Sequence, residues 1–107
     1  MENSPTSNDE IAQARYRHSG NVASREIAGE MLLVPIKTKT GAKTGIYMLN
    51  PTAAMIWNLL DGKRTVQELV QSVANEFEED PNLVMHDTGV FISDLLSFDA
   101  IVQVGEG

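Results

Sequence analysis

The hydrophobic and polar positions divide the chain into a polar opening, a segment with strand character and a longer segment with helical spacing. Residues 1–20 are polar, carry mixed charge and show no period that would bury one face, so we expect a flexible N-terminal tail. Three short runs follow at residues 22–27, 31–36 and 45–49, which are rich in β-branched or aromatic side chains. This pattern predicts three strands of an antiparallel sheet.

The connections between these predicted strands have the composition of turns. Ala28-Gly29-Glu30 favours a tight turn, and the hydrophilic segment KTKTGAKTG after Ile36 favours a longer one with two glycines. Pro35 has no amide proton to give to a neighbouring strand, so it fits the end of a strand or the edge of a sheet. This part of the chain therefore predicts a hairpin or meander.

Helical patterns begin at Asn50. This residue can cap a helix that starts at Pro51 and stops at Asp61-Gly62. Thr65 and Glu68 then have the spacing of a capping box, and the apolar residues after them recur every three or four positions. These signals predict two consecutive helices joined by a four-residue turn.

A third helix is predicted after the second one ends near Glu78. Asp80-Pro81 offers its start, and apolar residues at helical spacing continue to about Ser97. Gly89 inside this run costs about 1 kcal/mol relative to alanine, which weakens the prediction of one unbroken helix. Residues 101–104 have the character of a short last strand.

The order of these elements predicts an α+β fold, with a three-stranded antiparallel sheet followed by three helices. Two capped helices, a third helix and a small sheet are typical of a winged helix-turn-helix-like arrangement. With 107 residues, of which 42% are apolar, the chain can build a single core. We expect one domain over residues 21–104, between tails at residues 1–20 and 105–107.

The composition removes several classes of protein. Because the chain has no cysteine, it has no disulfide, thiolate zinc site, iron–sulfur ligand or cysteine nucleophile. No segment approaches the roughly 20 continuous apolar residues of a membrane span, and the polar opening lacks the apolar part of a secretory signal. We therefore expect a cytoplasmic protein that does not bind a membrane.

Charge is distributed unevenly along the chain. Residues 1–64 hold eight basic and six acidic residues, a net charge of +2, whereas residues 65–107 hold nine acidic residues and no Lys or Arg, a net charge of −9. Nucleic-acid binding depends on Lys and Arg that neutralise phosphates, so we expect no nucleic-acid partner. Lys37, Lys39 and Lys43 lie in the predicted long turn, where a strand-protecting role is commoner than phosphate binding.

The chain carries no catalytic or metal-binding constellation. Its two histidines, His18 and His86, lie in different predicted segments, and the position one turn after His86 is Val90, which cannot ligate a metal. Asp87 and Asp94 are two helical turns apart, but an acid/base pair would also need a cleft and shifted pKa values. We therefore expect no enzymatic activity, no metal and no cofactor.

The large apolar side chains are expected to fill the core. Trp57 lies among apolar residues of the first predicted helix, where a buried anchor is commoner than a stacking platform for bases. Four methionines lie in apolar runs, where they more often fill gaps in a core than form a peptide-binding surface. These methionines are Met31, Met48, Met55 and Met85.

The most distinctive motif covers residues 45 to 77, GIYMLNPTAAMIWNLLDGKRTVQELVQSVANEF. It resembles the central signature of the PqqD-like family (PQQ biosynthesis protein D), and the resemblance extends over about residues 22–102. The matching residues, in order, are Leu49-Asn50, Ala53-Ala54 with Trp57, Asp61-Gly62, Thr65 with Glu68, and Asp87 with Phe91 and Leu95.

The resemblance implies a non-catalytic adaptor, a recognition element for ribosomally synthesised and post-translationally modified peptides. Family members hold the leader of a precursor peptide as an added antiparallel strand between the third strand and the third helix. They present it to a modifying enzyme, often a radical S-adenosylmethionine (SAM) enzyme, as in PQQ biosynthesis. The peptide-binding residues implied here are Gly45, Ile46, Tyr47, Met48, Leu49, Asp87, Val90, Phe91, Asp94 and Leu95.

An exposed edge strand gives such binding a physical basis, because its unpaired N–H and C=O groups can pair with an extended peptide. Val90, Phe91 and Leu95 would receive apolar side chains of the leader, and Asp87 or Asp94 would pair with a Lys or Arg. Phe91 and Leu95 are explained equally well as core residues.

Two other functions fit the same outline. A winged-helix DNA-binding regulator would need Lys or Arg on the helix in the major groove, whereas the third predicted helix offers Asp87, Asp94 and no basic residue. A structural subunit would dock on an enzyme through the acidic C-terminal half without touching its substrate. A free edge strand also permits self-pairing, so we expect a monomer or a weak homodimer.

Overall fold

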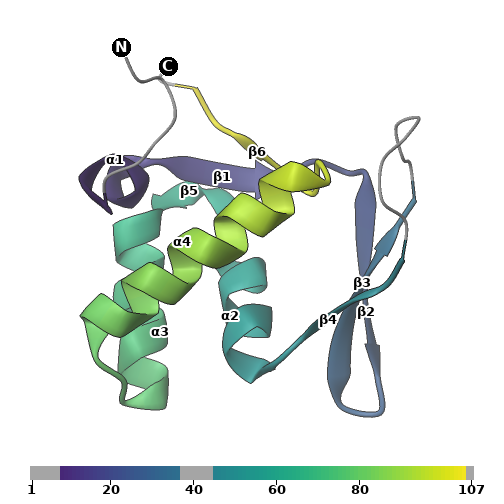
Figure 1. The fold of residues 1–107 in the computed structure, drawn as a ribbon, viewed down its shortest axis with the longest axis horizontal. Coiled ribbons are helices and arrows are strands. Elements are labelled where there is room, and N and C mark those ends of the chain that lie inside the picture. Colours follow the sequence, from purple (N-terminus) through teal and green to yellow (C-terminus); the bar gives the residue numbers. More distant parts are fainter. Residues whose placement is uncertain (1–7, 37–44, 106–107) are drawn as a thin grey trace.

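The computed structural model describes residues 8–36 and 45–105 (Figure 1). Within these ranges, six strands form two separate antiparallel sheets, ordered β5-β1-β6 and β2-β3-β4, and four helices pack with them. The elements are α1 (Asn8–Gln13), β1 (Arg15–His18), β2 (Val22–Ile27), β3 (Glu30–Pro35), β4 (Tyr47–Leu49), α2 (Pro51–Leu59), β5 (Asp61–Thr65), α3 (Val66–Phe77), α4 (Pro81–Ser97) and β6 (Ile101–Gln103).

The sheet β2-β3-β4 is built as the strand pattern predicts. Ala28 and Gly29 connect β2 to β3 with φ values of 54° and 82°, and positive φ at both central residues is the geometry of a two-residue hairpin turn. On its other side β3 pairs with β4, from Met31 opposite Leu49 to Leu33 opposite Tyr47. Because β4 is last in the order, one of its edges has no partner strand among the described residues.

The predicted helix starts are confirmed by their caps. Asn50 Oδ1 accepts a hydrogen bond from the Ala53 amide at 2.8 Å, and Asp80 Oδ1 accepts one from the Asn82 amide at 2.9 Å. Thr65 and Glu68 form the expected capping box at the start of α3. These contacts satisfy amides that have no partner inside a helix, so they fix where α2, α3 and α4 begin.

Helix α4 is continuous through Gly89, which answers the doubt that this glycine raised. A Cβ atom at Gly89 would lie 3.7 Å from Cδ1 of Ile11, so α1 packs closely against this turn of α4. The continuous helix places a long face opposite α2 and β4.

One hydrophobic core joins both sheets to the helices. Trp57 is at its centre with an exposed fraction of 1%, as predicted, and Tyr16 from β1 is equally enclosed at 2%. The His18 ring stacks on the Trp57 indole with centroids 3.7 Å apart, and its Nε2 lies 2.8 Å from the Trp57 carbonyl oxygen. The first strand therefore covers one side of the indole.

The expectation of a flexible tail over residues 1–20 is wrong for residues 8–18, which form α1 and β1. The physical reason is Tyr16, whose buried ring anchors β1 between β5 and β6. A single apolar residue within RYRH gives no detectable period in the sequence. Residues 1–7 of the expected tail, like residues 37–44 of the predicted long turn, lie outside the described residues.

The α+β class is confirmed, whereas one three-stranded sheet with three helices is not the arrangement found. The predicted four-residue turn at residues 61–64 is part of strand β5, which has no apolar side chain and exists because it pairs with β1. The last strand, β6, is confirmed, but it also pairs with β1. No helix among the described residues is long and apolar enough to cross a bilayer.

Candidate functional site

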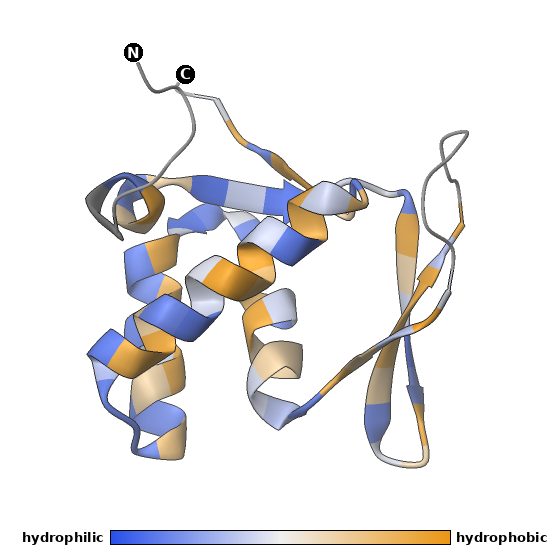
Figure 2. Ribbon diagram, viewed as in Figure 1, coloured by the Kyte–Doolittle hydropathy of each residue, from blue (hydrophilic) through white to orange (hydrophobic). Residues whose placement is uncertain are grey.

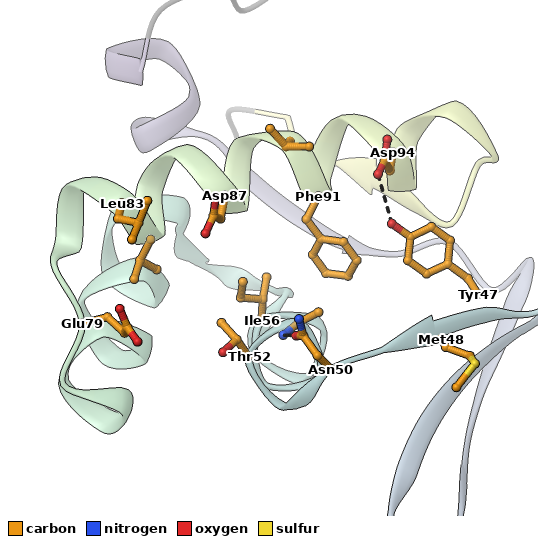
Figure 3. Close-up of a pocket in the computed structure, with 13 residues that line it drawn as sticks. Tyr47, Met48, Asn50, Thr52, Ile56, Glu79, Leu83, Asp87, Phe91 and Asp94 are labelled. Carbon is orange, nitrogen blue, oxygen red and sulfur yellow. Dashed lines mark hydrogen bonds between the residues drawn. The ribbon is translucent and has the colours of Figure 1, made fainter.

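A groove separates the free edge of β4 from one face of α4 (Figure 3). Its larger part is a cavity of about 490 Å³ between β4, the first turns of α2, and α4. Because α4 contributes residues three or four positions apart, the lining from this helix is a single helical face. The lining residues of α4 are Leu83, Val84, Asp87, Val90, Phe91 and Asp94.

A second cavity of about 340 Å³ continues the groove toward the end of α4. Tyr47 and Asp94 line both cavities, and Tyr47 Oη donates a hydrogen bond of 3.0 Å to Asp94 Oδ2 between them (Figure 3). This bond connects β4 to α4 across the groove. We call the two cavities together the β4–α4 groove.

The floor of the groove is apolar and belongs to the packed core. Phe91 is 7% exposed and Ile56 is 2% exposed, so both belong to the core and show only an edge to the cavity. The Tyr47 ring packs between Phe91 and Phe98, with centroid distances of 6.1 Å and 5.4 Å. An apolar side chain that enters the groove would therefore meet aromatic and aliphatic groups already held in place.

The rim of the groove is acidic and partly apolar. Glu79, Asp87 and Asp94 line the larger cavity, and neither cavity has a Lys or Arg among its described lining residues. Val90 lines the larger cavity and is 53% exposed. Such a groove is complementary to an apolar segment that also carries positive charge.

The sequence of residues 30–100 matches the family described as Coenzyme PQQ synthesis protein D (PqqD). This range covers about two thirds of the chain. The chain belongs to the PqqD family. PqqD proteins are non-catalytic peptide-binding domains, so family membership confirms the expectation of a binding protein rather than an enzyme.

The fold of this PqqD-family chain is also similar to a solved structure described as TbiB1 in complex with the TbiA(beta) leader peptide. The similarity has a TM-score of 0.66 at 23% sequence identity, and it covers 84% of this chain and 99% of the other. No curated protein sequence matches the chain. The structural likeness establishes a shared fold over most of the chain.

The structure brings eight of the ten sequence-predicted site residues to the β4–α4 groove. Tyr47, Met48, Asp87, Val90, Phe91 and Asp94 line the larger cavity, and Gly45 and Ile46 line the smaller one with Tyr47 and Asp94. Gly45 and Ile46 precede β4 rather than forming part of it. The peptide-binding role of these residues stays a prediction.

Leu49 and Leu95 are placed elsewhere. Leu49 is 5% exposed and Leu95 is fully buried, so both face the core and line neither cavity. For Leu95 the core explanation given by the sequence is the right one. The sequence favours a core position for Met48, but in the structure its side chain is 62% exposed.

The sequence reasoning missed the two ends of the groove. Helical spacing from Asp87 back to Leu83 and Val84, and from Asp94 on to Ser97 and Phe98, would have found the residues that α4 contributes there. Asn50, Thr52, Ala53 and Ile56 of the α2 start had no such signal, because their proximity to α4 depends on the tertiary fold.

The two histidines lie apart in the described part of the chain. His18 is stacked on Trp57 while His86 is exposed on α4. No group of three His, Asp or Glu side chains in residues 8–36 and 45–105 is arranged to hold a metal ion. Asp87 and Asp94 belong to the groove rim described above.

The two tyrosines of the chain should ionise at a higher pH than an exposed tyrosine does. Burial raises the pKa of Tyr16, and for Tyr47 burial, the hydrogen bond to Asp94 and the charge of its carboxylate all raise the pKa above 10.0. Since the folded state holds these protons more tightly, the resulting stabilisation is present below pH 10 and is lost as the pH rises through the raised values. Ultraviolet titration of tyrosinate should show both residues ionising above the ordinary value. Tyr47→Phe should leave one transition, and ionisation of either tyrosine at or below pH 10 would contradict the assignment.

Proposed function

We propose that this PqqD-family chain holds the leader segment of a ribosomally made precursor peptide as an added antiparallel strand on the free edge of β4. The observation that carries the proposal is that this edge adjoins an apolar groove with an acidic rim. TbiB1, which shares the fold, is described in complex with a leader peptide, and this supports the same kind of ligand here.

The backbone of β4 would supply affinity that does not depend on sequence. Its unpaired N–H and C=O groups lie at the spacing of an extended chain, and each new hydrogen bond contributes about 0.5–1.5 kcal/mol net. With only three residues in β4, Gly45 and Ile46 would extend the pairing edge. Backbone pairing alone would therefore be weak, and the groove must supply the rest.

Side chains of the leader would supply selectivity. In an added strand every second side chain points toward α4, so successive groove-facing positions would reach the two cavities on either side of the Tyr47–Asp94 hydrogen bond. The smaller cavity, with Leu33, Ile46 and Phe98, suits an apolar side chain. The larger one combines an apolar floor with Glu79, Asp87 and Asp94, and suits a long Lys or Arg side chain whose stem packs on the floor.

Membership of the PqqD family supports an adaptor role. The bound leader would be presented to a modifying enzyme, and a radical SAM enzyme is the class that the family resemblance implies. The family description points to PQQ synthesis as one such pathway. DNA binding by a winged helix is disfavoured, because α4 carries Asp87 and Asp94 and no basic residue.

A selection from a library of random linear peptides displayed on messenger RNA tests this function without knowledge of the natural leader. The immobilised full chain should enrich extended segments with apolar residues two positions apart and a neighbouring Lys or Arg. Asp87→Lys should lose the preference for a basic residue and keep the apolar one. If the wild type enriches no peptide, or if Asp87→Lys enriches the same ones, the groove is not the binding site.

A further inference from the structure

The two cavities of the β4–α4 groove differ in charge. Hydrophilic and hydrophobic residues occur along the whole of α4, so the lining of each cavity decides which charges face the groove (Figure 2). Glu79 and Asp87 line the larger cavity, and neither carboxylate has a hydrogen bond or ion pair with another described residue. The smaller cavity has one charged residue in its described lining, Asp94, whose carboxylate accepts the hydrogen bond from Tyr47. Within the described lining, unpaired negative charge is therefore confined to the larger cavity.

The two cavities follow each other along β4 in a fixed order. Gly45 and Ile46 line the smaller cavity and precede β4, whereas Asn50 follows β4 and lines the larger one. On α4 the order is reversed, because Asp87 lines the larger cavity and Ser97, farther along the helix, lines the smaller one. The strand and the helix therefore pass the groove in opposite directions, and a peptide strand beside β4 would meet the cavities one after the other.

A leader that pairs antiparallel with β4 has a defined direction in this groove. Because β4 runs from Tyr47 to Leu49, the leader would run from the Asn50 side to the Gly45 side. Its upstream part would then lie at the larger cavity and its downstream part at the smaller one. The leader residue opposite Tyr47 would point toward α4 as Tyr47 does, and so would the residues two positions before and after it. Leader residues that reach the two cavities are therefore an even number of positions apart.

We propose that the groove selects leaders in which a Lys or Arg comes first and an apolar residue follows two or four positions later. This inference rests on the proposed strand addition and adds to it the order of the recognised residues. The basic side chain would lie beside Glu79 and Asp87, whose carboxylates have no other partner among the described residues. The apolar side chain would lie against Leu33 and Phe98.

The reverse order places both side chains less favourably. A Lys or Arg at the smaller cavity would meet an apolar lining and a carboxylate that already accepts the hydrogen bond from Tyr47. Its charge would lose water for a weaker electrostatic gain. An apolar residue at the larger cavity would lie beside the carboxylates of Glu79 and Asp87 and pair with neither. Asp87, which lies on α4 and lines only the larger cavity, is therefore the main residue that determines the order.

A competition between two peptide libraries displayed on messenger RNA tests the order. In the Lys-first library a fixed Lys precedes a fixed Leu by two or four positions in an otherwise random linear peptide. In the Leu-first library the two fixed residues are exchanged. The immobilised full chain should enrich the Lys-first library about tenfold or more over the Leu-first library. A fully random library, selected in parallel, measures whether the chain binds peptides at all.

Moving one carboxylate along α4 tests the role of Asp87. The exchange Asp87→Ser with Ser97→Asp keeps the composition and the net charge, and both positions are exposed, so the circular dichroism spectrum should not change. It carries the carboxylate from the larger cavity to the smaller one, and should shift the ratio of the libraries about tenfold toward the Leu-first one. Asp87→Ser with Ser93→Asp is the matched control, because Ser93 is exposed on α4 and lines neither cavity. It should shift the ratio less, since no carboxylate enters the smaller cavity.

The outcomes distinguish this inference from the proposed function. If the chain enriches peptides from the random library but enriches the two ordered libraries equally, or prefers the Leu-first one, the order is wrong while peptide binding stands. An exchange variant with the same library ratio as the wild type would also overturn the inference, because the Asp87 carboxylate would then not determine the order. If no library is enriched, the proposed function fails and the order fails with it.

Discussion

Replacing Trp57 by alanine is expected to lower the free energy of unfolding by about 3–5 kcal/mol, the usual cost of truncating a buried tryptophan. The indole is 1% exposed, packs in the core and is covered by the His18 ring. Removal of the indole leaves a cavity between β1 and α2, and these two elements would have to move to fill it. Urea unfolding followed by circular dichroism measures the loss.

Such a loss is a large part of the 5–15 kcal/mol that stabilises a typical domain. Trp57→Phe is the matched control, since it keeps an aromatic ring against His18 and should cost clearly less. The His18 Nε2 atom bonds to the backbone carbonyl oxygen of residue 57, so this hydrogen bond is available in both variants. A loss below about 1 kcal/mol for Trp57→Ala would mean that the indole is not the anchor of the core.

Val90→Asp is expected to weaken binding of a selected peptide at least tenfold while leaving the stability of the chain nearly unchanged. Val90 is 53% exposed on α4 in the free protein, so the substitution should change the free energy of unfolding by no more than about 0.5 kcal/mol. In the complex, however, the new carboxylate would be covered by apolar side chains of the leader, and burying an unpaired charge is costly.

Isothermal titration calorimetry of the peptide against wild type and variant measures the effect. Leu96→Asp serves as the control, because Leu96 is exposed on α4 and lines neither cavity. An equal loss in both variants would point to a general effect of negative charge on α4. Unchanged affinity in Val90→Asp would place the peptide outside the β4–α4 groove.

The sequence predicts those elements whose signals are local. Asn50, Thr65 and Asp80 are capping residues next to the helices that they start, and the structure places each helix where its cap indicates. Three-residue and four-residue spacing along α4 likewise identifies Asp87, Val90, Phe91 and Asp94 as one face, and this face lines the groove.

The remaining features depend on contacts between distant parts of the chain. Strand β5 has no apolar residue, and β1 has only Tyr16, so neither shows a period before they pair. The Tyr47–Asp94 hydrogen bond joins residues 47 positions apart. Leu95 follows Asp94 of the groove face directly, but its side chain is buried in the core. Apolar spacing alone does not tell which of two neighbouring helix residues faces the groove and which faces the core.

The central claim, strand addition on β4, is tested most directly by a scan of single N-methyl groups along the backbone of a selected peptide. In an antiparallel pair, successive residues turn their N–H groups alternately toward and away from the neighbouring strand. We therefore expect affinity to fall at every second position opposite residues 45–49 and to change little between them. Equal losses at consecutive positions, or no loss at any, would contradict strand addition on β4.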